Sequence, residues 1–244
     1  MLLKACINGA RRFDAHPALP VTPVTLGWAA AASVRAGAGA VHFHVRGPDK
    51  EQSLQADDVA RCVDAVRRAL DKVTIGVSTL LSIVPDPDAR VAVVSKWAVL
   101  PDFASVNFIE AGSPALARVL IDKGVGIEAG LSDASAAKAL ASSGLGQQCL
   151  RILVEPRGAT VEAALKSADE MIAVLDGAGI TRPRLLHGSN ATAWGVLDEA
   201  IRRGLDTRIG LEDVLTLPDG SAAADNAAII AAARRKVEQS GRQV

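Results

Sequence analysis

The sequence predicts an α/β protein that folds as a (β/α)8 TIM barrel, and three observations support this fold class. Short β-branched runs alternate with alanine-rich segments whose apolar residues recur at helical spacing. The alternation repeats eight times in 244 residues, which is about the length typical of such a barrel. The strand segments are nearly continuous apolar runs, as expected for parallel strands that helices cover.

The predicted elements follow one another in strict order. Strands are expected at residues 2–8, 40–46, 73–80, 103–109, 124–130, 149–155, 183–187 and 206–211. Helices are expected at residues 22–37, 56–70, 87–98, 113–123, 132–143, 160–178, 190–203 and 223–238. An open doubly wound sheet is the alternative, but such a sheet usually carries a GxGxxG fingerprint after its first strand. The segment INGARRF, residues 7–13, has none.

Several helix boundaries carry local signals. Thr22 precedes Pro23, which is the arrangement of an N-cap followed by proline in the first turn. Ser113 and Pro114 repeat this arrangement at a later helix. Glycines follow four of the predicted helices, as C-terminal caps do, at positions 37, 124, 144 and 204.

Composition and charge narrow the class of protein. No Pro/Gly/Ser-rich linker or charge run divides the chain, so residues 1–244 are expected to form a single domain. Lys plus Arg and Asp plus Glu balance at 27 each, which argues against a general nucleic-acid binder. No apolar run approaches the ~18 residues of a membrane span, and the N-terminus reads as a strand rather than a signal peptide. Three scattered cysteines without a CxxC spacing fit a cytoplasmic protein.

The C-terminal ends of the strands are where a barrel of this kind places its active site. His42 and His44 lie there on the second predicted strand, and because they are two residues apart their side chains share one face. Such a pair can hold one metal ion through two ring nitrogens, and a carboxylate commonly supplies a third ligand. Glu212 follows the eighth strand, which is a close neighbour in a closed barrel. Two hydrogen-bonded structural histidines are the alternative, since the HxH motif alone is weak.

Glu212 is followed directly by a second carboxylate, Asp213, and preceded by Arg208. One carboxylate can bind a metal ion while its neighbour moves a proton. Arg208 and Asp213 can converge if the backbone turns at residues 210–211, which the glycine there permits. A solvated acidic pair at the start of a loop is the alternative.

Two further segments suggest anion sites. Residues 187–190, His-Gly-Ser-Asn, end the seventh strand and begin a helix, where free N–H groups bind anions. An ordinary N-cap at Ser189 or Asn190 explains the same residues equally well. Arg157, in VEPRGAT, also lies beside a helix start.

With these residues in place, the chain resembles the β-keto acid cleavage enzyme family, best known for 3-keto-5-aminohexanoate cleavage. The supporting stretches are INGARR…HPALPVTP (7–23), AGAGAVHFHVR (36–46), GVSTL (76–80), SVNF (105–108), IGLEDVLTLPDG (209–220) and DNAAII (225–230). They extend over essentially the whole chain. The combination of HxHxR with a late GxED is the most specific part.

The resemblance implies a (β/α)8 barrel that binds one divalent metal ion, normally zinc (Zn2+), and forms a homo-oligomer, a dimer or a tetramer. His42, His44 and Glu212 match the family's metal ligands. Asp213 matches the aspartate that moves the proton, and Arg208 matches the arginine that orients it. The implied reaction joins a β-keto acid with acetyl-CoA to give acetoacetate and a new acyl-CoA.

Other residues are expected to contact the substrate. Ser78, Thr79 and Asn107 match positions that line the family's substrate pocket. Arg46 or Arg11 is expected to pair with the substrate carboxylate through two parallel hydrogen bonds. Arg11 stands where the best-characterised relatives carry a glutamate near the metal. This departure favours an acidic or neutral β-keto acid over an amine-bearing one.

Three other functions compete with this one. A zinc hydrolase of the amidohydrolase kind needs its HxH on the first strand and further histidines later, where only His187 is available. A metal-dependent aldolase or decarboxylase that acts on a keto acid without CoA would use the same residues. A non-catalytic barrel that binds a small acid is the third, although the three ligands together with Asp213 argue against it.

Overall fold

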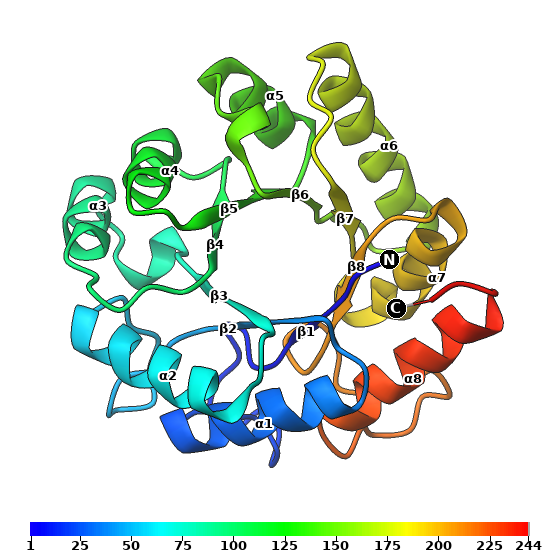
Figure 1. The fold of residues 1–244 in the computed structure, drawn as a ribbon. Coiled ribbons are helices and arrows are strands. Elements are labelled where there is room, and N and C mark those ends of the chain that lie inside the picture. Colours follow the sequence, from blue (N-terminus) through cyan, green and yellow to red (C-terminus); the bar gives the residue numbers. More distant parts are fainter. Residues whose placement is uncertain (244) are drawn as a thin grey trace.

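The computed structural model, which describes residues 1–243, confirms the (β/α)8 TIM barrel (Figure 1). The eight parallel strands lie in the order β7-β6-β5-β4-β3-β2-β1-β8. A parallel bridge between Leu185 and Asp206 brings the two outer strands together, so the ring is nearly closed. No helix in the described part of the chain combines the length and hydrophobicity that crossing a bilayer requires.

Every predicted strand and helix is present, and the strands are shorter than predicted. The strands are β1 (Leu3–Cys6), β2 (Ala40–Phe43), β3 (Thr74–Ser78), β4 (Phe103–Asn107), β5 (Gly126–Leu131), β6 (Arg151–Val154), β7 (Arg184–Leu186) and β8 (Thr207–Ile209). The α-helices are α1 (Pro23–Arg35), α2 (Ala56–Ala69), α3 (Pro87–Ser95), α4 (Ser113–Asp122), α5 (Ala134–Ser143), α6 (Val161–Gly177), α7 (Ala193–Arg203) and α8 (Asn226–Gln239). The helices form an outer layer around the ring of strands (Figure 1).

The end of β2 shows why a predicted strand stops early. The strand pairing continues as far as Phe43. Beyond it, the side chain of Asn8 donates to the His44 carbonyl at 2.9 Å and accepts from the His44 N–H at 2.8 Å. Because one side chain occupies both backbone groups of His44, these groups are lost to the sheet, and the backbone of His44 is held by the segment that follows β1.

The helix caps agree only in part with the prediction. Thr22 caps α1 as expected, and its hydroxyl accepts the backbone N–H three residues on. The prediction for Ser113 is wrong, because the capping residue is Gly112, which has a φ of 74°. Ser113 is the first residue of α4, and its hydroxyl instead donates to the carbonyls of Asn107 (2.5 Å) and Glu110 (2.7 Å).

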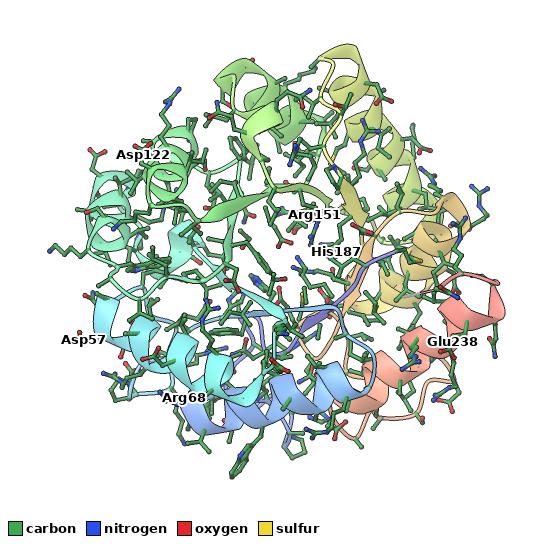
Figure 2. All side chains as sticks on the ribbon, in the orientation of Figure 1. Asp57, Arg68, Asp122, Arg151, His187 and Glu238 are labelled. Carbon is green, nitrogen blue, oxygen red and sulfur yellow. The ribbon has the colours of Figure 1, made fainter. Side chains whose placement is uncertain are left out.

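A buried ion cluster fills the barrel toward the N-terminal ends of the strands. Glu128 on β5 pairs with Lys4 on β1 and with Arg151 on β6, the latter at 2.9 Å. A buried charge is stable only with partners, so these three side chains link strands on different sides of the ring. Figure 2 shows Arg151 and His187 inside the ring, whereas Asp57 lies on its outer surface.

Gly210, just after β8, lies against the backbone of β1. A Cβ at this position would lie 2.1 Å from the Cys6 carbonyl oxygen, so no side chain fits unless the backbone moves. We therefore expect Gly210→Ala to lower the free energy of unfolding by about 1–3 kcal/mol, the usual range for overpacking. Urea denaturation measures this as a lower midpoint.

Gly177→Ala is the matched control for this substitution. Gly177 ends α6, and nothing lies within 4 Å of a Cβ built there. Alanine has the higher helix propensity, so the control is expected to be at least as stable as the wild type. An unchanged urea midpoint for Gly210→Ala contradicts the packing argument.

Candidate active site

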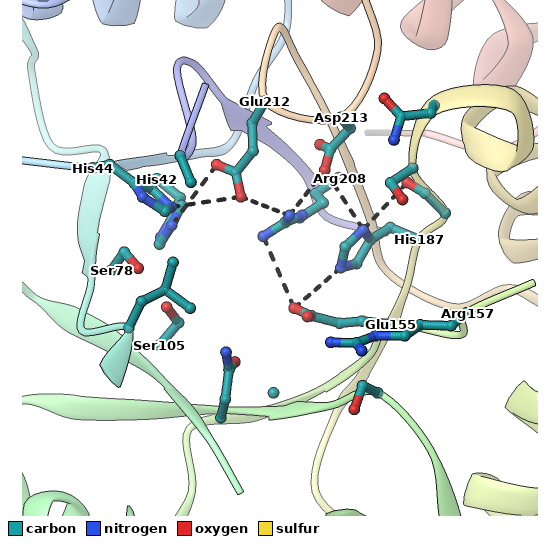
Figure 3. A pocket seen from close by; sticks show the side chains of 18 of the residues that line it. His42, His44, Ser78, Ser105, Glu155, Arg157, His187, Arg208, Glu212 and Asp213 are labelled. Atoms are coloured by element: carbon teal, nitrogen blue, oxygen red, sulfur yellow. Dashed lines mark hydrogen bonds and ion pairs between the residues drawn. The ribbon is translucent and has the colours of Figure 1, made fainter. Parts of the chain in front are cut away.

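A cavity of about 530 Å³ opens at the C-terminal ends of the strands (Figure 3). All eight strands, or the loops that follow them, contribute to its lining. The polar side chains that line it are Arg11, His42, His44, Ser78, Ser105, Asn107, Ser132, Glu155, Arg157, His187, Ser189, Asn190, Arg208, Glu212 and Asp213. This is the end of the barrel where the fold places its active sites.

The three predicted metal ligands meet on one side of the cavity. Nε2 of His42 lies 3.9 Å from Oε2 of Glu212, and Nε2 of His44 lies 3.7 Å from its Oε1. One donor atom from each residue lies within 4.8 Å of the other two. Ligand atoms around a tetrahedral zinc ion lie roughly 3.4 Å apart, so small side-chain shifts would close this group on an ion.

Gln52 determines which ring nitrogen of His44 is free to bind a metal ion. Oε1 of Gln52 lies 2.5 Å from Nδ1 of His44, so this nitrogen carries the hydrogen and donates it. In the neutral ring Nε2 then keeps its lone pair, and this nitrogen faces Glu212. Hydrogen-bond partners of this kind orient metal-binding imidazoles in proteins.

Burial and charge also fit the group to a cation. Burial lowers the pKa of His42 well below its usual value, so the ring is neutral and can bind a metal. Burial alone would raise the pKa of Glu212, but the charge of Arg208 holds it well below its usual value. Oε2 of the ionised Glu212 is buried without a hydrogen-bond partner among residues 1–243. Such an oxygen fits a metal ligand.

Arg208 joins the two neighbouring carboxylates. Its Nη2 donates to Oε1 of Glu212 and to Oδ1 of Asp213, both at 2.8 Å. The predicted turn makes this possible, since the Asp213 N–H donates to the Gly210 carbonyl at 2.9 Å. Burial raises the pKa of Asp213 more than the guanidinium lowers it, so its carboxylate is a stronger base than usual.

Glu155 and His187 form a second pair on the opposite side of Arg208. Val154 and Leu186 are register partners in β6 and β7, so the residues that follow them are neighbours. Nε2 of His187 lies 3.2 Å from Oε1 of Glu155. Its Nδ1 lies 3.7 Å from Oδ1 of Asp213, as the dashed lines in Figure 3 show. His187 thus lies between two carboxylates. The sequence analysis, which placed His187 in a possible anion site, did not predict this arrangement.

Two guanidiniums lie at the rim of the cavity. Nε of Arg11 donates to the Leu211 carbonyl at 2.5 Å, and Nη2 donates to Oδ1 of Asn190 at 3.2 Å. These bonds hold Arg11 against the loops that follow β7 and β8. Arg157 is exposed and lines the cavity as well. The rim therefore carries positive charge.

Arg46 and Thr79 do not line the cavity. Arg46 is 3% exposed and donates to three backbone carbonyls, those of Gly9 (2.7 Å), Arg11 (2.8 Å) and Lys50 (3.2 Å). Thr79 donates to the Ser105 carbonyl at 2.7 Å. Both side chains hold neighbouring segments together, so their positions give no support to the predicted contacts with substrate.

Ser78 and Asn107 do line the cavity, as predicted. Nδ2 of Asn107 donates to Oε1 of Glu110 at 3.2 Å, so the carboxamide oxygen points the other way. A Cβ at position 130 would lie 2.3 Å from that oxygen, so a side chain there would push the Asn107 carboxamide aside. Gly130 thus makes room for Asn107.

Three site residues to which the sequence analysis assigned no role differ in the signals that could have identified them. Ser105 lies two residues before Asn107 on β4, so the alternation used for His42 and His44 identifies it. Glu155 directly follows β6, beside the residue that follows β7, and the strand register identifies it once the barrel is known. Gln52 reaches His44 only because a backbone bridge pairs it with Arg46, and no sequence pattern indicates that bridge.

Fold and geometry together define a (β/α)8 barrel with a candidate metal centre beside a carboxylate–guanidinium pair. A profile of the beta-keto acid cleavage enzyme family matches residues 1–244. The chain belongs to this family, which confirms the resemblance that its sequence motifs indicate.

Solved structures share the fold at low sequence identity. The apo structure of ObcA superposes with a TM-score of 0.73 at 18% identity, covering 93% of this chain and 63% of that chain. The ternary complex of ObcA with a C4-CoA adduct and oxalate gives 0.75 at 18% identity, covering 93% and 65%. An N-acetylmannosamine-6-phosphate 2-epimerase from Clostridium perfringens gives 0.58 at 11% identity, covering 87% of each chain. The chain spans less than two thirds of the length of ObcA, and these likenesses establish the fold alone.

We expect the purified protein to bind about one equivalent of divalent metal, because three ligands converge on one point. The double substitution His42→Ala, His44→Ala should abolish this binding. Gln52→Leu should weaken it by about 10–100-fold, the usual effect of losing a partner that orients a ligand. Elemental analysis and titration against a chelator measure both effects.

His16→Ala is the control for the histidine substitutions, since His16 lies outside the cavity and hydrogen-bonds the Ala223 carbonyl at 2.9 Å. Full metal binding by the double variant would place the ion elsewhere in the molecule.

Proposed function

We propose that this protein is a zinc-dependent β-keto acid cleavage enzyme that uses acetyl-CoA. A β-keto acid, R–CO–CH2–COO⁻, and acetyl-CoA would give R–CO–SCoA and acetoacetate by Claisen and retro-Claisen steps. The observation that carries this proposal is the His42–His44–Glu212 group beside Asp213 in one cavity. Family membership supports the keto-acid substrate. ObcA has been captured with oxaloacetate and with a C4-CoA adduct, which supports a keto acid and a CoA thioester as the reactants.

His42, His44 and Glu212 would hold the zinc ion. Two imidazoles and one carboxylate with an open position are a common ligand set of catalytic zinc. When bound, zinc supplies a Lewis acid that polarises a ketone beside the bond to be changed.

Asp213 is the group that we expect to take a proton from the carbon between the ketone and the carboxylate. Its side chain is 2% exposed, and Oδ1 is held by Arg208. Oδ2 is buried without a hydrogen-bond partner among the described residues, so it is available to accept a proton. The resulting enolate attacks the thioester carbonyl of acetyl-CoA. The thiolate that leaves then attacks the original ketone, and the bond between that ketone carbon and the former CH2 carbon breaks.

The competing functions differ in what they require. A keto-acid aldolase or decarboxylase would use the same residues and turn over without CoA. A barrel that only binds a small acid would show no turnover of any keto acid. A hydrolase of the amidohydrolase kind has little support, because the HxH lies on and just after β2 and His187 is paired with Glu155.

One screen separates these functions. The zinc-loaded protein is incubated with acetyl-CoA and, in turn, acetoacetate, 3-oxohexanoate, 3-oxoadipate and 5-amino-3-oxohexanoate. New acyl-CoA is followed by mass spectrometry, using ¹³C-acetyl-CoA in the acetoacetate reaction. The proposal requires CoA-dependent turnover with at least one acid. Product formed without CoA supports the aldolase or decarboxylase, and no product from any acid contradicts the proposal.

We expect the two neighbouring carboxylates to differ when changed. Asp213→Asn keeps the shape but cannot accept the proton, so kcat should fall by about 10²–10⁴-fold, the usual scale for loss of a general base, with full metal content. Glu212→Gln should instead weaken metal binding, and excess zinc should restore part of the activity. Steady-state kinetics with metal analysis measures both.

The opposite pattern, in which Asp213→Asn loses the metal and Glu212→Gln keeps it, reverses the assignment. If Asp213→Asn and Glu212→Gln both keep their activity, the reaction takes place elsewhere in the barrel.

Arg11→Ala should raise KM more than it lowers kcat. Arg11 is positioned at the rim by Leu211 and Asn190, where its charge can bind a substrate carboxylate or a CoA phosphate. Arg12→Ala is the matched control, because Arg12 is exposed and pairs with Asp14. Kinetics with each substrate varied in turn show which one Arg11 binds, and an unchanged KM for both refutes this role.

A further inference from the structure

The cavity contains a pair of side chains that the proposed reaction does not use. His187 contacts Asp213 through one ring nitrogen and Glu155 through the other. We infer that His187 and Glu155 form a proton relay between Asp213 and solvent. The inference rests on the proposed function, since the relayed proton is the one that Asp213 takes from the substrate.

Exposure rises along this path. The side chain of Asp213 is 2% exposed, that of His187 is 4% exposed and that of Glu155 is 26% exposed. A proton on Asp213 is therefore enclosed by protein, whereas a proton on Glu155 can pass to water. His187 is the residue that lies between the two carboxylates in the cavity wall (Figure 3).

The distances suit transfer after a small movement. Nε2 of His187 lies 3.2 Å from Oε1 of Glu155. Nδ1 lies 3.7 Å from Oδ1 of Asp213, which is roughly 1 Å longer than a short hydrogen bond. Nε2 is buried and makes no well-aligned hydrogen bond within residues 1–243. Contacts of this kind often tighten only when substrate binds.

Arg208 lies close to both ends of the relay. It donates to Asp213 at 2.8 Å, and its Nη1 lies 4.0 Å from Oε1 of Glu155. Burial alone would raise the pKa of Glu155, but His187 and Arg208 lower it below its usual value. Glu155 therefore gives up a proton to water readily.

The proton balance closes over one reaction cycle. When the substrate C–H bond breaks, its electrons remain in the enolate and the proton goes to Asp213. In the tautomer with its hydrogen on Nε2, His187 accepts that proton on Nδ1 once the Asp213 carboxyl group turns the protonated oxygen toward it. It passes the hydrogen on Nε2 to Glu155, which releases it to water, and Nδ1 is then able to donate to the Gly188 carbonyl, 3.4 Å away. When the enolate of the product is protonated, a proton travels the opposite way and restores the first tautomer of His187.

Deuterium incorporation tests this inference. The reaction is run in D2O with acetyl-CoA and whichever acid of the screen turns over fastest, and deuterium at C2 of the acetoacetate formed is measured by mass spectrometry. The early time points are corrected with a sample that lacks protein. The zinc-loaded wild type should return mainly deuterium to C2, because the relay exchanges the abstracted proton with solvent. His187→Gln and Glu155→Gln should return the original proton, so the deuterated fraction should fall at least about threefold.

This fraction is a ratio within the product, so a smaller amount of active protein does not change it. His16→Gln, outside the cavity, is the matched control and should give the wild-type fraction. An unchanged fraction in both relay variants, with metal bound, overturns the relay while the proposed function stands. A wild type that forms no acetoacetate from any acid overturns the proposed function and the relay with it.

Discussion

The contact between Arg208 and the two carboxylates after β8 is the interaction on which the rest of the site depends. One guanidinium nitrogen holds Glu212 and Asp213 at the same distance of 2.8 Å, so the side chain that faces the histidines and the side chain that faces His187 are fixed relative to each other. Buried ion pairs are weak contributors to stability, because desolvation offsets much of their attraction. The role of an arginine buried among acidic partners is therefore better explained by the side chains that it positions than by a contribution to stability.

The barrel places this arginine through backbone contacts. Gly210 lets the chain after β8 approach the Cys6 carbonyl, and the Glu212 N–H donates to that same carbonyl at 3.1 Å. On the other side of β1, Asn8 fixes the backbone of His44. The first strand and the residues just after it thus hold the candidate ligands that follow β2 and β8 in one register. This explains why an unbroken barrel, with strands from both ends of the chain side by side, is needed to assemble three ligands that lie up to 170 residues apart in sequence.

The order of strands and helices could be predicted from the sequence, because a buried parallel strand and an amphipathic helix have different periods. The ligand group could be proposed for a similar reason, since alternation on a strand puts His42 and His44 on one face. The sequence could not show which polar side chains hydrogen-bond to other parts of the protein and are therefore not free to contact a substrate. Arg46 and Arg11 both lie near the ends of neighbouring strands, yet Arg46 donates to three backbone carbonyls while Arg11 reaches the rim. The capping residue of α4 could not be predicted either. Ser113 and Gly112 are both local candidates, and the carbonyls that accept from Ser113 lie at the end of β4 and in the loop after it.

Charge connects the metal centre with the choice of substrate. Three carboxylates, those of Glu155, Glu212 and Asp213, surround the single guanidinium of Arg208, and the burial of His42 keeps that imidazole neutral. A divalent cation on the ligand group balances this excess of negative charge. With the inner charges balanced in this way, Arg11 and Arg157 at the rim leave the whole cavity positive. A positive cavity attracts anions and repels amines. With the proposed metal bound, this charge arrangement would therefore favour the proposed reactants, a carboxylate-bearing keto acid and the phosphates of CoA, over an amine-bearing substrate.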